Sequence, residues 1–298
     1  MRVLVTGANG MLGTDLCALL EAGGHDVVRT GVTDRADRPA DQWERLDITD
    51  FSSVATVVLR HQPDAVIHCA AYTDVDGCER DPHKAYLVNT QGTWNVAAVC
   101  GAHNITLSYV STDFVFDGAK NSPYTEFDTV NPLNHYGASK LAGEKLVAQL
   151  CRKHFIARTS WLFGAHGKCF PATMLRLAQT RPELSVVFDQ IGSPTYTVDL
   201  ARTLIMLLHT PLYGTYHVCN AGHCSWAEFA QQTLTLAGLS DITVKPVPAS
   251  DWPSPTQRPA YSVMRRFALE MQGHDNLSPW QQALAEFIAL KKQQASSV

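Results

Sequence analysis

The chain opens with Arg2-Val-Leu-Val-Thr6, a short apolar and β-branched run, followed at once by Gly7-Ala-Asn-Gly10-Met-Leu-Gly13. The run predicts a β-strand, and the residues from Met11 to about Ala22 predict a helix. Glycines let the backbone approach a ligand closely, and the N-terminus of a helix favours a negative charge such as a pyrophosphate. The stretch therefore predicts a dinucleotide-binding turn at the start of an α/β fold, with a tight turn that binds nothing as the alternative.

Strand and helix patterns alternate through the first half of the chain. Further strands are predicted at 26–30, 44–46, 65–68, 106–111 and 155–159, with long helices at 82–102 and 136–151. This alternation predicts a doubly wound parallel sheet, in which ligands bind at the carboxyl ends of the strands. We expect residues 1–160 to form a dinucleotide-binding domain that parts of 186–240 complete. Residues 161–298 are expected to form mainly a smaller, interleaved substrate-binding region.

The second half of the chain has a looser pattern. Helices are predicted at 170–180, 197–208, 225–237 and 279–293, and strands at 184–187 and 214–218. Ser225 precedes Glu228 by three residues, which predicts a capping box at the start of one helix. Prolines become frequent from Pro246 onward, so that segment is expected to be irregular. The apolar spacing of several helices would permit a homodimer but does not require one.

Composition excludes several classes of function. The 298 residues are 45% hydrophobic and 17% charged, with a formal net charge of −4, which gives no electrostatic reason to expect binding to nucleic acid or to an anionic membrane. No apolar run is long enough for a transmembrane helix. The eight cysteines form no CxxC pair, and we expect them to be reduced, as in a cytoplasmic protein. Cys219 and Cys224 with His217 and His223 come closest to a metal-ligand pattern, but their spacing does not predict a metal site.

A pair of residues with the chemistry of an alcohol or ketone oxidoreductase follows the strand at 106–111. Tyr136 and Lys140 lie four residues apart on a predicted helix and therefore share one face. An ammonium near a tyrosine makes the phenol proton easier to lose, and Thr112 could offer its hydroxyl to the same substrate oxygen. A chance pairing of Tyr136 and Lys140 would explain neither Thr112 nor the glycine turn.

The second strand bears on the choice of cofactor. Sites that prefer NAD place an acid at the end of this strand, whereas here the sequence reads Arg29-Thr30-Gly31 and the first acid is Asp34. Arg29 would suit a 2′-phosphate, so the sequence predicts NADPH, with NADH as the alternative. A solvated edge position is the other interpretation of Arg29. Asp47-Ile48 is placed to meet the adenine, and the small residues of Cys69-Ala70-Ala71 leave room for a ligand across the sheet.

Several motifs in order along the chain together carry a resemblance. They are Ala70-Ala-Tyr-Thr73, Ser111-Thr-Asp-Phe-Val-Phe-Asp-Gly118, Tyr136-Gly-Ala-Ser-Lys-Leu-Ala-Gly-Glu144, Arg158-Thr-Ser-Trp161, Asp189-Gln-Ile-Gly-Ser-Pro-Thr195 and Arg258-Pro259. With the glycine turn and Asn89, they resemble an extended short-chain dehydrogenase/reductase with a Rossmann sheet. Within that superfamily the chain is most similar to the dTDP-4-dehydrorhamnose reductase family.

The resemblance implies a role for each matching position. Tyr136 would protonate the C4 oxygen of a nucleotide-linked 4-keto-6-deoxyhexose as hydride arrives, Lys140 would lower the pKa of Tyr136 and hold the nicotinamide ribose, and Thr112 would steady the oxygen. The residues expected to bind the cofactor are Gly7, Asn9, Gly10, Met11, Leu12, Gly13, Arg29, Asp47, Ile48, Cys69, Ala70, Ala71, Tyr72, Asn89, Tyr136 and Lys140. Those expected to bind the nucleotide sugar are Thr73, Val75, Thr112, Asp113, Phe114, Trp161, Gln190, Gly192, Pro194, Thr195 and Arg258. The implied activity is NADPH-dependent reduction of dTDP-4-dehydro-L-rhamnose to dTDP-L-rhamnose, a step of dTDP-rhamnose biosynthesis.

Two departures from the family pattern leave more than one nucleotide sugar as the possible substrate. Phe114 stands where the family usually has tyrosine, and the segment after Arg258-Pro259 lacks the usual Leu-Asp. A related nucleotide-sugar 4-ketoreductase with different sugar stereochemistry is therefore an alternative. Phe114 also lacks the carboxylate that 4,6-dehydratases use, which argues against dehydration. An alternative of another class is a non-catalytic NADP-binding subunit that resembles the regulatory subunit of methionine adenosyltransferase.

Overall fold

The computed structural model describes residues 1–33, 43–252 and 254–296. Its centre is a parallel sheet of seven strands in the order β11-β6-β5-β4-β1-β2-β3. The strands are β1 (Arg2–Thr6), β2 (Asp26–Gly31), β3 (Glu44–Arg45), β4 (Ala65–His68), β5 (Thr106–Thr112), β6 (His154–Thr159) and β11 (Gly214–His217). The order reverses on the two sides of β1, so the predicted doubly wound α/β sheet is confirmed.

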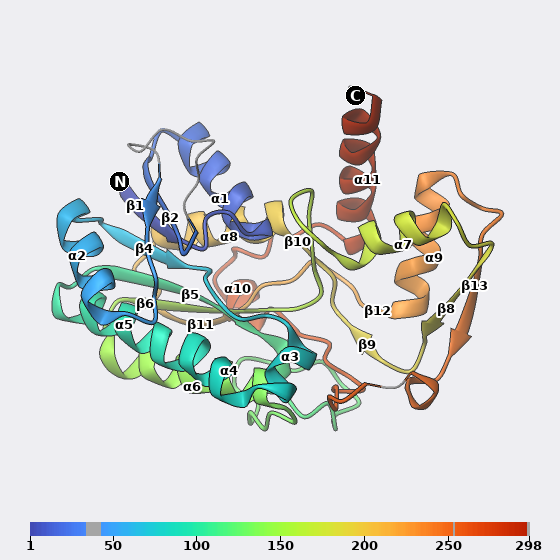
Figure 1. Cartoon of the computed structure of the whole chain (residues 1–298), viewed down its shortest axis with the longest axis horizontal. Helices are drawn as coiled ribbons and strands as arrows, with labels where there is room; N and C mark the ends of the chain where they lie inside the picture. The colour runs from blue at the N-terminus through green and yellow to red at the C-terminus, as the bar shows by residue number, and fades with distance from the viewer. Residues whose placement is uncertain (34–42, 253, 297–298) are drawn as a thin grey trace.

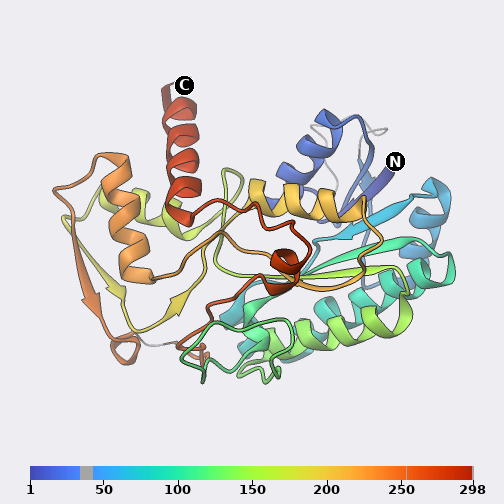
Figure 2. The ribbon, with the colours of Figure 1, turned by 180° about the vertical axis from the view of Figure 1, so that it is seen from behind.

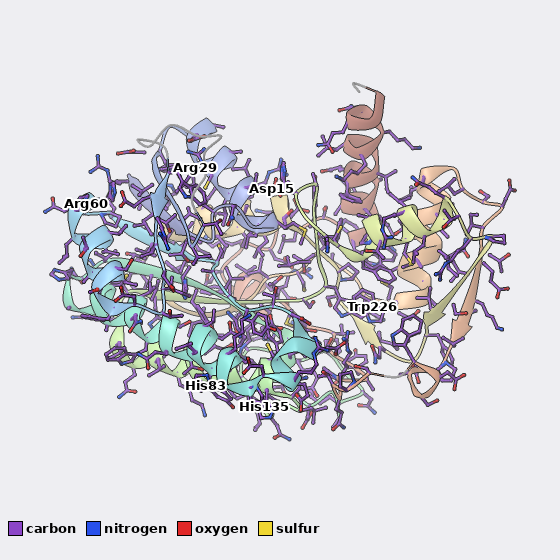
Figure 3. All side chains as sticks on the ribbon, viewed as in Figure 1. Asp15, Arg29, Arg60, His83, His135 and Trp226 are labelled. Carbon is purple, nitrogen blue, oxygen red and sulfur yellow. The ribbon has the colours of Figure 1, made fainter. Side chains whose placement is uncertain are left out.

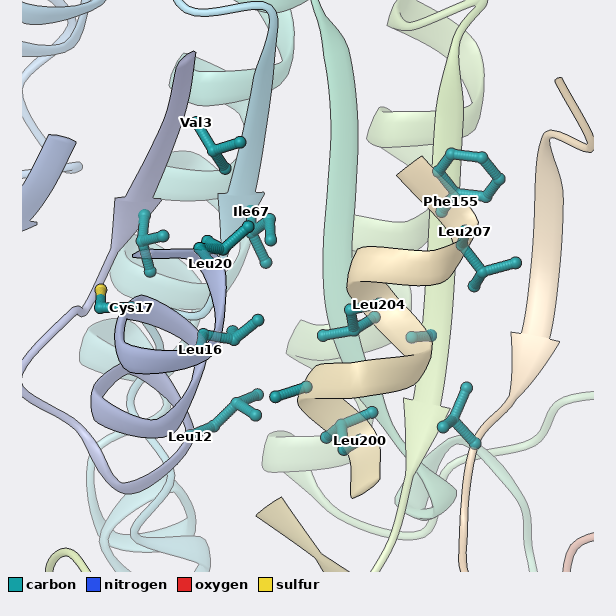
Figure 4. Packing of buried hydrophobic residues seen from close by; sticks show 14 of the residues in the cluster. Val3, Leu12, Leu16, Cys17, Leu20, Ile67, Phe155, Leu200, Leu204 and Leu207 are labelled. Atoms are coloured by element: carbon teal, nitrogen blue, oxygen red, sulfur yellow. The ribbon is translucent and has the colours of Figure 1, made fainter. Parts of the chain in front are cut away.

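Helices cover both faces of this sheet. One face carries α1 (Met11–Ala22), α8 (Thr197–Leu208) and the short α10 (Phe267–Met271), and the other carries α2 (Phe51–His61), α5 (Thr93–Ala102) and α6 (His135–Leu150). Figures 1 and 2 show the two helical layers on either side of the strands. Figure 4 shows Leu16 and Leu20 of α1 and Leu204 of α8 packed against the strands. The two faces of the sheet are thus buried, as its continuous apolar strands require.

A smaller lobe stands beside the sheet, at the carboxyl ends of the strands (Figure 1). Its helices are α7 (Phe170–Ala178), α9 (Trp226–Ala237) and α11 (Trp280–Ser296). Its two-stranded sheets pair β8 (Glu183–Val187) with β13 (Thr243–Val247) and β9 (Ile191–Gly192) with β12 (Cys224–Ser225). A third pair, β7 (Leu162–Phe163) with β10 (Thr195–Tyr196), lies where the two lobes meet. Trp226, at the first position of α9, lies on the side of this lobe nearer the sheet (Figure 3).

Some elements differ from the sequence predictions for physical reasons. The helix predicted at 82–102 divides into α4 (Pro82–Tyr86), a π-helical turn η1 (Leu87–Gly92) and α5. Pro246 lies inside a strand that was not predicted, β13, which tolerates the proline because it pairs on one side only, with β8. The capping box of Ser225 and Glu228 is confirmed: each residue's side chain accepts a hydrogen bond from the backbone N–H of the other.

Candidate active site

A cavity of about 650 Å³ runs along the carboxyl ends of β1, β4, β5 and β6. This is the edge at which a doubly wound sheet binds its ligand. The predicted residues that line it are Gly7, Asn9, Gly10, Met11, Leu12, Gly13, Asp47, Ile48, Cys69, Ala70, Ala71, Thr73, Val75, Thr112, Asp113, Phe114, Tyr136, Lys140, Trp161 and Arg258. The fold therefore brings most of the predicted site residues to one place, although they come from segments spread over most of the chain.

The glycine turn is shaped for a close approach to a phosphate group. Gly7 has φ +67°, a left-handed conformation that favours glycine. A Cβ atom on Gly13 would lie 2.3 Å from the carbonyl oxygen of Gly7, so no larger residue fits without a shift of the backbone. Gly10 caps α1 and has no side chain to bond the first N–H groups of the helix. Those amides are left for an anionic ligand, and the turn fits the pyrophosphate of a dinucleotide.

Arg29 lies away from this cavity. Its guanidinium forms a 2.5 Å ion pair with Glu21 of α1, and its side chain is 12% exposed. The cavity is lined instead by Gly31 and Val32, at the end of β2. Arg29 lies two residues before the end of β2, where the strand packs against α1, whereas the cavity opens only at the carboxyl end of the strand. The structure therefore does not support the predicted 2′-phosphate contact of Arg29, and Asp34 lies outside the described residues.

Asn89 and Tyr72 are also absent from the cavity wall. The Asn89 side chain is fully buried, accepts from the Tyr72 backbone N–H at 2.8 Å, and donates to the Tyr72 carbonyl and to Ser139 Oγ, each at 3.0 Å. The Tyr72 ring lies under the ammonium of Lys84, 4.5 Å from the ring centre. Through these hydrogen bonds Asn89 holds the loop after β4 against helix α6, so it supports the cavity without lining it. π-Helical turns such as η1 are frequent at functional sites.

The three predicted catalytic residues all line the cavity. Thr112 ends β5, and Tyr136 and Lys140 lie on α6, which begins at His135 because the Asn134 side chain accepts from the backbone N–H of Gly137. The Lys140 ammonium donates to the carbonyl of Val110 at 2.7 Å and lies over the Tyr109 ring. These contacts fix the direction of the Lys140 side chain.

Burial dominates the electrostatics of this group. It lowers the pKa of Lys140 to about 7 and raises the pKa of Asp113 to about 6. The sequence led us to expect Lys140 to lower the pKa of Tyr136. Burial instead raises the pKa of Tyr136, and the interaction with the Thr112 hydroxyl offsets this only in part. The phenol is therefore protonated at neutral pH, which is the form that can give a proton to a substrate.

The part of the cavity that is predicted to bind the substrate is rich in aromatic side chains. The Phe114 ring meets the Tyr136 ring edge to face, with centroids 5.6 Å apart. Trp161 has φ +47°, which is an uncommon backbone conformation for a bulky residue. Such strained residues cluster at active sites and ligand-binding sites. Gln190 lines a small adjoining cavity, which it shares with Arg258 and Trp226.

Three predicted substrate residues lie behind the wall. Gly192, Pro194 and Thr195 line neither cavity. A Cβ on Gly192 would lie 2.5 Å from Trp161 Cε2, so Gly192 leaves the room in which the indole sits. Thr195 is fully buried and pairs with Leu162 in the β7–β10 ladder. These residues support the wall without forming its surface.

The sequence reasoning missed Trp226. Its indole stacks on that of Trp161, with centroids 3.5 Å apart and planes inclined by 8°, and it lines both cavities. The capping box had located Trp226 at the start of a helix, but nothing in the sequence pairs it with Trp161. Other lining residues that were not predicted are Gly31, Val32, Leu46, Thr49, Val88, Val110, Ser111, Thr159, Ser160, Leu162, Pro259 and Ser262.

Within the described ranges, no three or more His, Cys, Asp or Glu side chains gather in a way that could hold a metal ion. Cys219 and Cys224 are buried free thiols. The helices of the described chain also include none of the length and apolarity needed to cross a bilayer.

Comparison with known proteins gives matches over almost the whole chain. Residues 1–293 match the family described as the RmlD substrate binding domain. The spore coat polysaccharide biosynthesis protein SpsK of Bacillus subtilis is 41% identical over 96% of both chains. The dTDP-4-keto-6-deoxy-D-glucose reductase of Streptomyces niveus is 40% identical over 97% of both.

A solved structure gives the same result. The dTDP-4-dehydrorhamnose reductase of Bacillus anthracis, in complex with NADP, is 43% identical and superposes with a TM-score of 0.90 over 97% of this chain and 98% of its own. The resemblance carried by the sequence motifs is thus confirmed at the level of sequence and of fold. This chain belongs to the dTDP-4-dehydrorhamnose reductase family.

Proposed function

We propose that this protein is an NADPH-dependent oxidoreductase that reduces the C4 keto group of a nucleotide-linked 4-keto-6-deoxyhexose. The expected substrate is dTDP-4-dehydro-L-rhamnose, and the expected product is dTDP-L-rhamnose. The observation that carries this proposal is the meeting of Thr112, Tyr136 and Lys140 in one cavity with the glycine turn. Relatives named as reductases of dTDP-linked keto sugars, together with a close structural neighbour that holds NADP, support it.

The cavity fits a dinucleotide cofactor. The backbone amides at the start of α1 would hold the pyrophosphate, while Asp47 and Ile48 would lie beside the adenosine and Cys69, Ala70 and Ala71 beside the sheet edge. When bound, NADPH supplies the hydride that reduces C4. The rest of the chemistry belongs to side chains of this chain.

Tyr136 would give its phenol proton to the C4 oxygen. Its raised pKa keeps the proton in place until negative charge develops on that oxygen. Thr112 lies on the same cavity wall, and its hydroxyl would turn from Asp113 Oδ1 to donate a hydrogen bond to the same oxygen. Lys140, held by the carbonyl of Val110, would stabilise the phenolate that remains on Tyr136.

The nucleotide sugar would lie between the sheet and the smaller lobe. Asp113 and Phe114 face the cavity from the end of β5, and Trp161, Trp226 and Arg258 face it from the other side. Arg258 suits the diphosphate because a guanidinium makes charge-assisted hydrogen bonds to phosphate oxygens. Phe114 presents an apolar edge to the sugar, so the exact configuration at the sugar carbons is a matter for product analysis.

The test is the consumption of NADPH, and separately of NADH, with freshly prepared dTDP-4-dehydro-β-L-rhamnose. We expect rapid oxidation of NADPH by the natural chain and loss of turnover in Tyr136→Phe, with cofactor binding retained. Unchanged turnover in Tyr136→Phe would refute the assigned role. Cofactor binding by the natural chain without turnover of this or related keto sugars would favour the non-catalytic regulatory subunit instead.

The setting that we propose for this activity is the cytoplasm. All eight cysteines are free thiols, which suits a reducing compartment. A homodimer stays a prediction, which the mass of the protein in solution would test.

A further inference from the structure

The segment Ser254–Pro259 joins the smaller lobe to a helix that flanks the sheet. That helix is α3 (Val75–Arg80), and the residue on it that contacts the segment is Asp76, in its first turn. One carboxylate oxygen of Asp76 accepts from Ser254 Oγ at 3.1 Å and from Arg258 Nη2 at 3.1 Å. The pKa of Asp76 is lowered: burial alone would raise it, but the hydroxyl of Thr256 and the guanidinium of Arg258 outweigh burial. The Asp76 carboxylate thus accepts hydrogen bonds from side chains of a segment that is distant in the sequence.

The same segment is attached at two further points. The Asn134 side chain, which caps α6 just before Tyr136, donates to the carbonyl of Gln257 at 2.9 Å. Pro259 packs on Gly118, where an added Cβ would lie 2.6 Å from the proline ring. Gly118 has φ +72°, so a substitution there would also be strained. The segment is therefore fastened to the sheet lobe beside the catalytic residues.

Arg258 is the member of this segment that reaches the proposed substrate site. It lines both the main cavity and the small adjoining one. Its side chain is 33% exposed, and that of Asp76 is 32% exposed. A guanidinium carries five N–H donors. Among the described residues, Asp76 is the polar partner that the structure gives to Arg258, which leaves donors free to meet a ligand.

We propose that Asp76 is a positioning residue: it fastens Ser254–Pro259 across the cavity and directs the Arg258 guanidinium at the diphosphate of the nucleotide sugar. This inference rests on the proposed function, since it assigns a diphosphate to that part of the site. Its prediction for the binding of an anion is opposite in sign to the prediction from electrostatics alone. Removal of a negative charge next to Arg258 should strengthen the binding of an anion if only electrostatics mattered, whereas loss of a positioning contact should weaken it.

The test measures binding of dTDP to the full chain saturated with NADPH, by calorimetry at low salt. We expect Asp76→Ala to raise the dissociation constant of dTDP about ten-fold, the size typical for a lost hydrogen bond to a charged group. Asp76→Asn should recover most of this loss, because its amide oxygen still accepts from Ser254 and Arg258. Asp74→Asn is the matched control: it removes one charge from the same helix terminus, keeps the N-cap acceptor, and should leave dTDP binding unchanged.

Two results would overturn the inference. One is that Asp76→Ala binds dTDP as tightly as the natural chain or more tightly. Asp76 would then have no effect on dTDP binding or would compete with dTDP for Arg258. A parallel loss of NADPH affinity would mean that Asp76 merely supports the fold. Because dTDP binding needs no turnover, these outcomes are independent of the reductase assay. A chain that binds dTDP through Arg258 but never oxidises NADPH would refute the proposed reaction and leave the role of Asp76 intact.

Discussion

The Thr112 hydroxyl donates to Oδ1 of Asp113 at 3.1 Å, while Oδ2 of the same buried carboxylate makes no hydrogen bond of normal geometry in the described part of the chain, although the nearby Ser262 hydroxyl opposes the rise of the Asp113 pKa. Asp113 is 2% exposed, so the unpartnered oxygen is not compensated by bulk water. The carboxylate belongs to the cavity wall, where a sugar hydroxyl could reach it. Stability is thus given up at a position that suits substrate recognition, which is common at functional sites.

Asp113 leads to a prediction about stability and pH. Burial raises its pKa to about 6, against about 3.9 in an unfolded chain. Between these two values the native state binds more protons than the unfolded state, so the contribution of Asp113 is favourable below pH ~4 and is lost as the pH rises through ~6. We expect Asp113→Asn to raise the free energy of unfolding by about 1–3 kcal/mol at pH 8 and by less toward pH 5.

Urea denaturation at several pH values between 5 and 8 measures this effect. Asp26→Asn, which alters an exposed ion pair with Arg2, is the control and should leave the pH dependence as it is. Equal pH dependence in Asp113→Asn and in the natural chain would contradict the prediction. The variant should also turn over substrate more slowly, because an amide oxygen accepts a hydrogen bond from a sugar hydroxyl more weakly than a charged carboxylate does.

Much of the fold and of the site followed from local patterns. The glycine turn and the Tyr136–Lys140 pair could be predicted because their local geometry depends on neighbours within one or two turns of the chain. The stacking of Trp226 on Trp161 could not, because it depends on how the two lobes pack. Arg29 and Asn89 lie outside the cavity wall for a related reason: the sequence shows the residue type, but burial against α1 or Tyr72 decides whether a side chain faces the cavity.

The glycine turn offers a matched pair of substitutions. A Cβ at position 13 would lie 2.3 Å from the Gly7 carbonyl oxygen and 2.8 Å from Ala8 Cα, both backbone atoms that cannot rotate away. A Cβ at position 10 would meet only the Gly7 oxygen, at 3.2 Å. We expect Gly13→Ala to lose NADPH binding by at least about ten-fold, as overpacking typically costs 1–3 kcal/mol, and Gly10→Ala to lose much less. Fluorescence titration with NADPH compares the two, and equal losses would show that the close approach at Gly13 is unimportant.

The buried ion pair of Glu144 and Arg158 supports the site from behind. Arg158 donates to both carboxylate oxygens, at 2.8–3.2 Å, and the side chains are 7% and 5% exposed. The Ser111 hydroxyl, at the cavity wall, donates to the same carboxylate at 2.5 Å. Glu144→Gln would leave the Arg158 charge without compensation, and we expect it to lower the free energy of unfolding by about 3–5 kcal/mol.

Chemical denaturation measures this loss, and the double variant Glu144→Met with Arg158→Met separates its cause. Because the double variant buries no lone charge, we expect it to be more stable than Glu144→Gln. A double variant that is less stable than the single one would instead assign the effect to packing.

The single variant Glu144→Gln should also lower the pKa of Lys140 further, since Glu144 is the nearby charge that opposes the effect of burial. The alkaline limb of the pH–activity profile should therefore move to lower pH.

Gly192 tests whether the position of Trp161 matters for the substrate alone. An added Cβ would lie 2.5 Å from Cε2 and 2.6 Å from Nε1 of the indole, whose neighbour Trp226 stacks at 3.5 Å, so the indole can shift only by disturbing the stack. We expect Gly192→Ala to raise KM for the nucleotide sugar about ten-fold or more, since overpacking typically costs about 1–3 kcal/mol, while NADPH binding at the glycine turn stays unchanged. Trp161→Phe in the same chain should relieve the clash and bring KM below that of Gly192→Ala. An unchanged KM in Gly192→Ala would show that the wall yields freely, and a shared loss of NADPH affinity would place the damage in the fold rather than in the substrate wall.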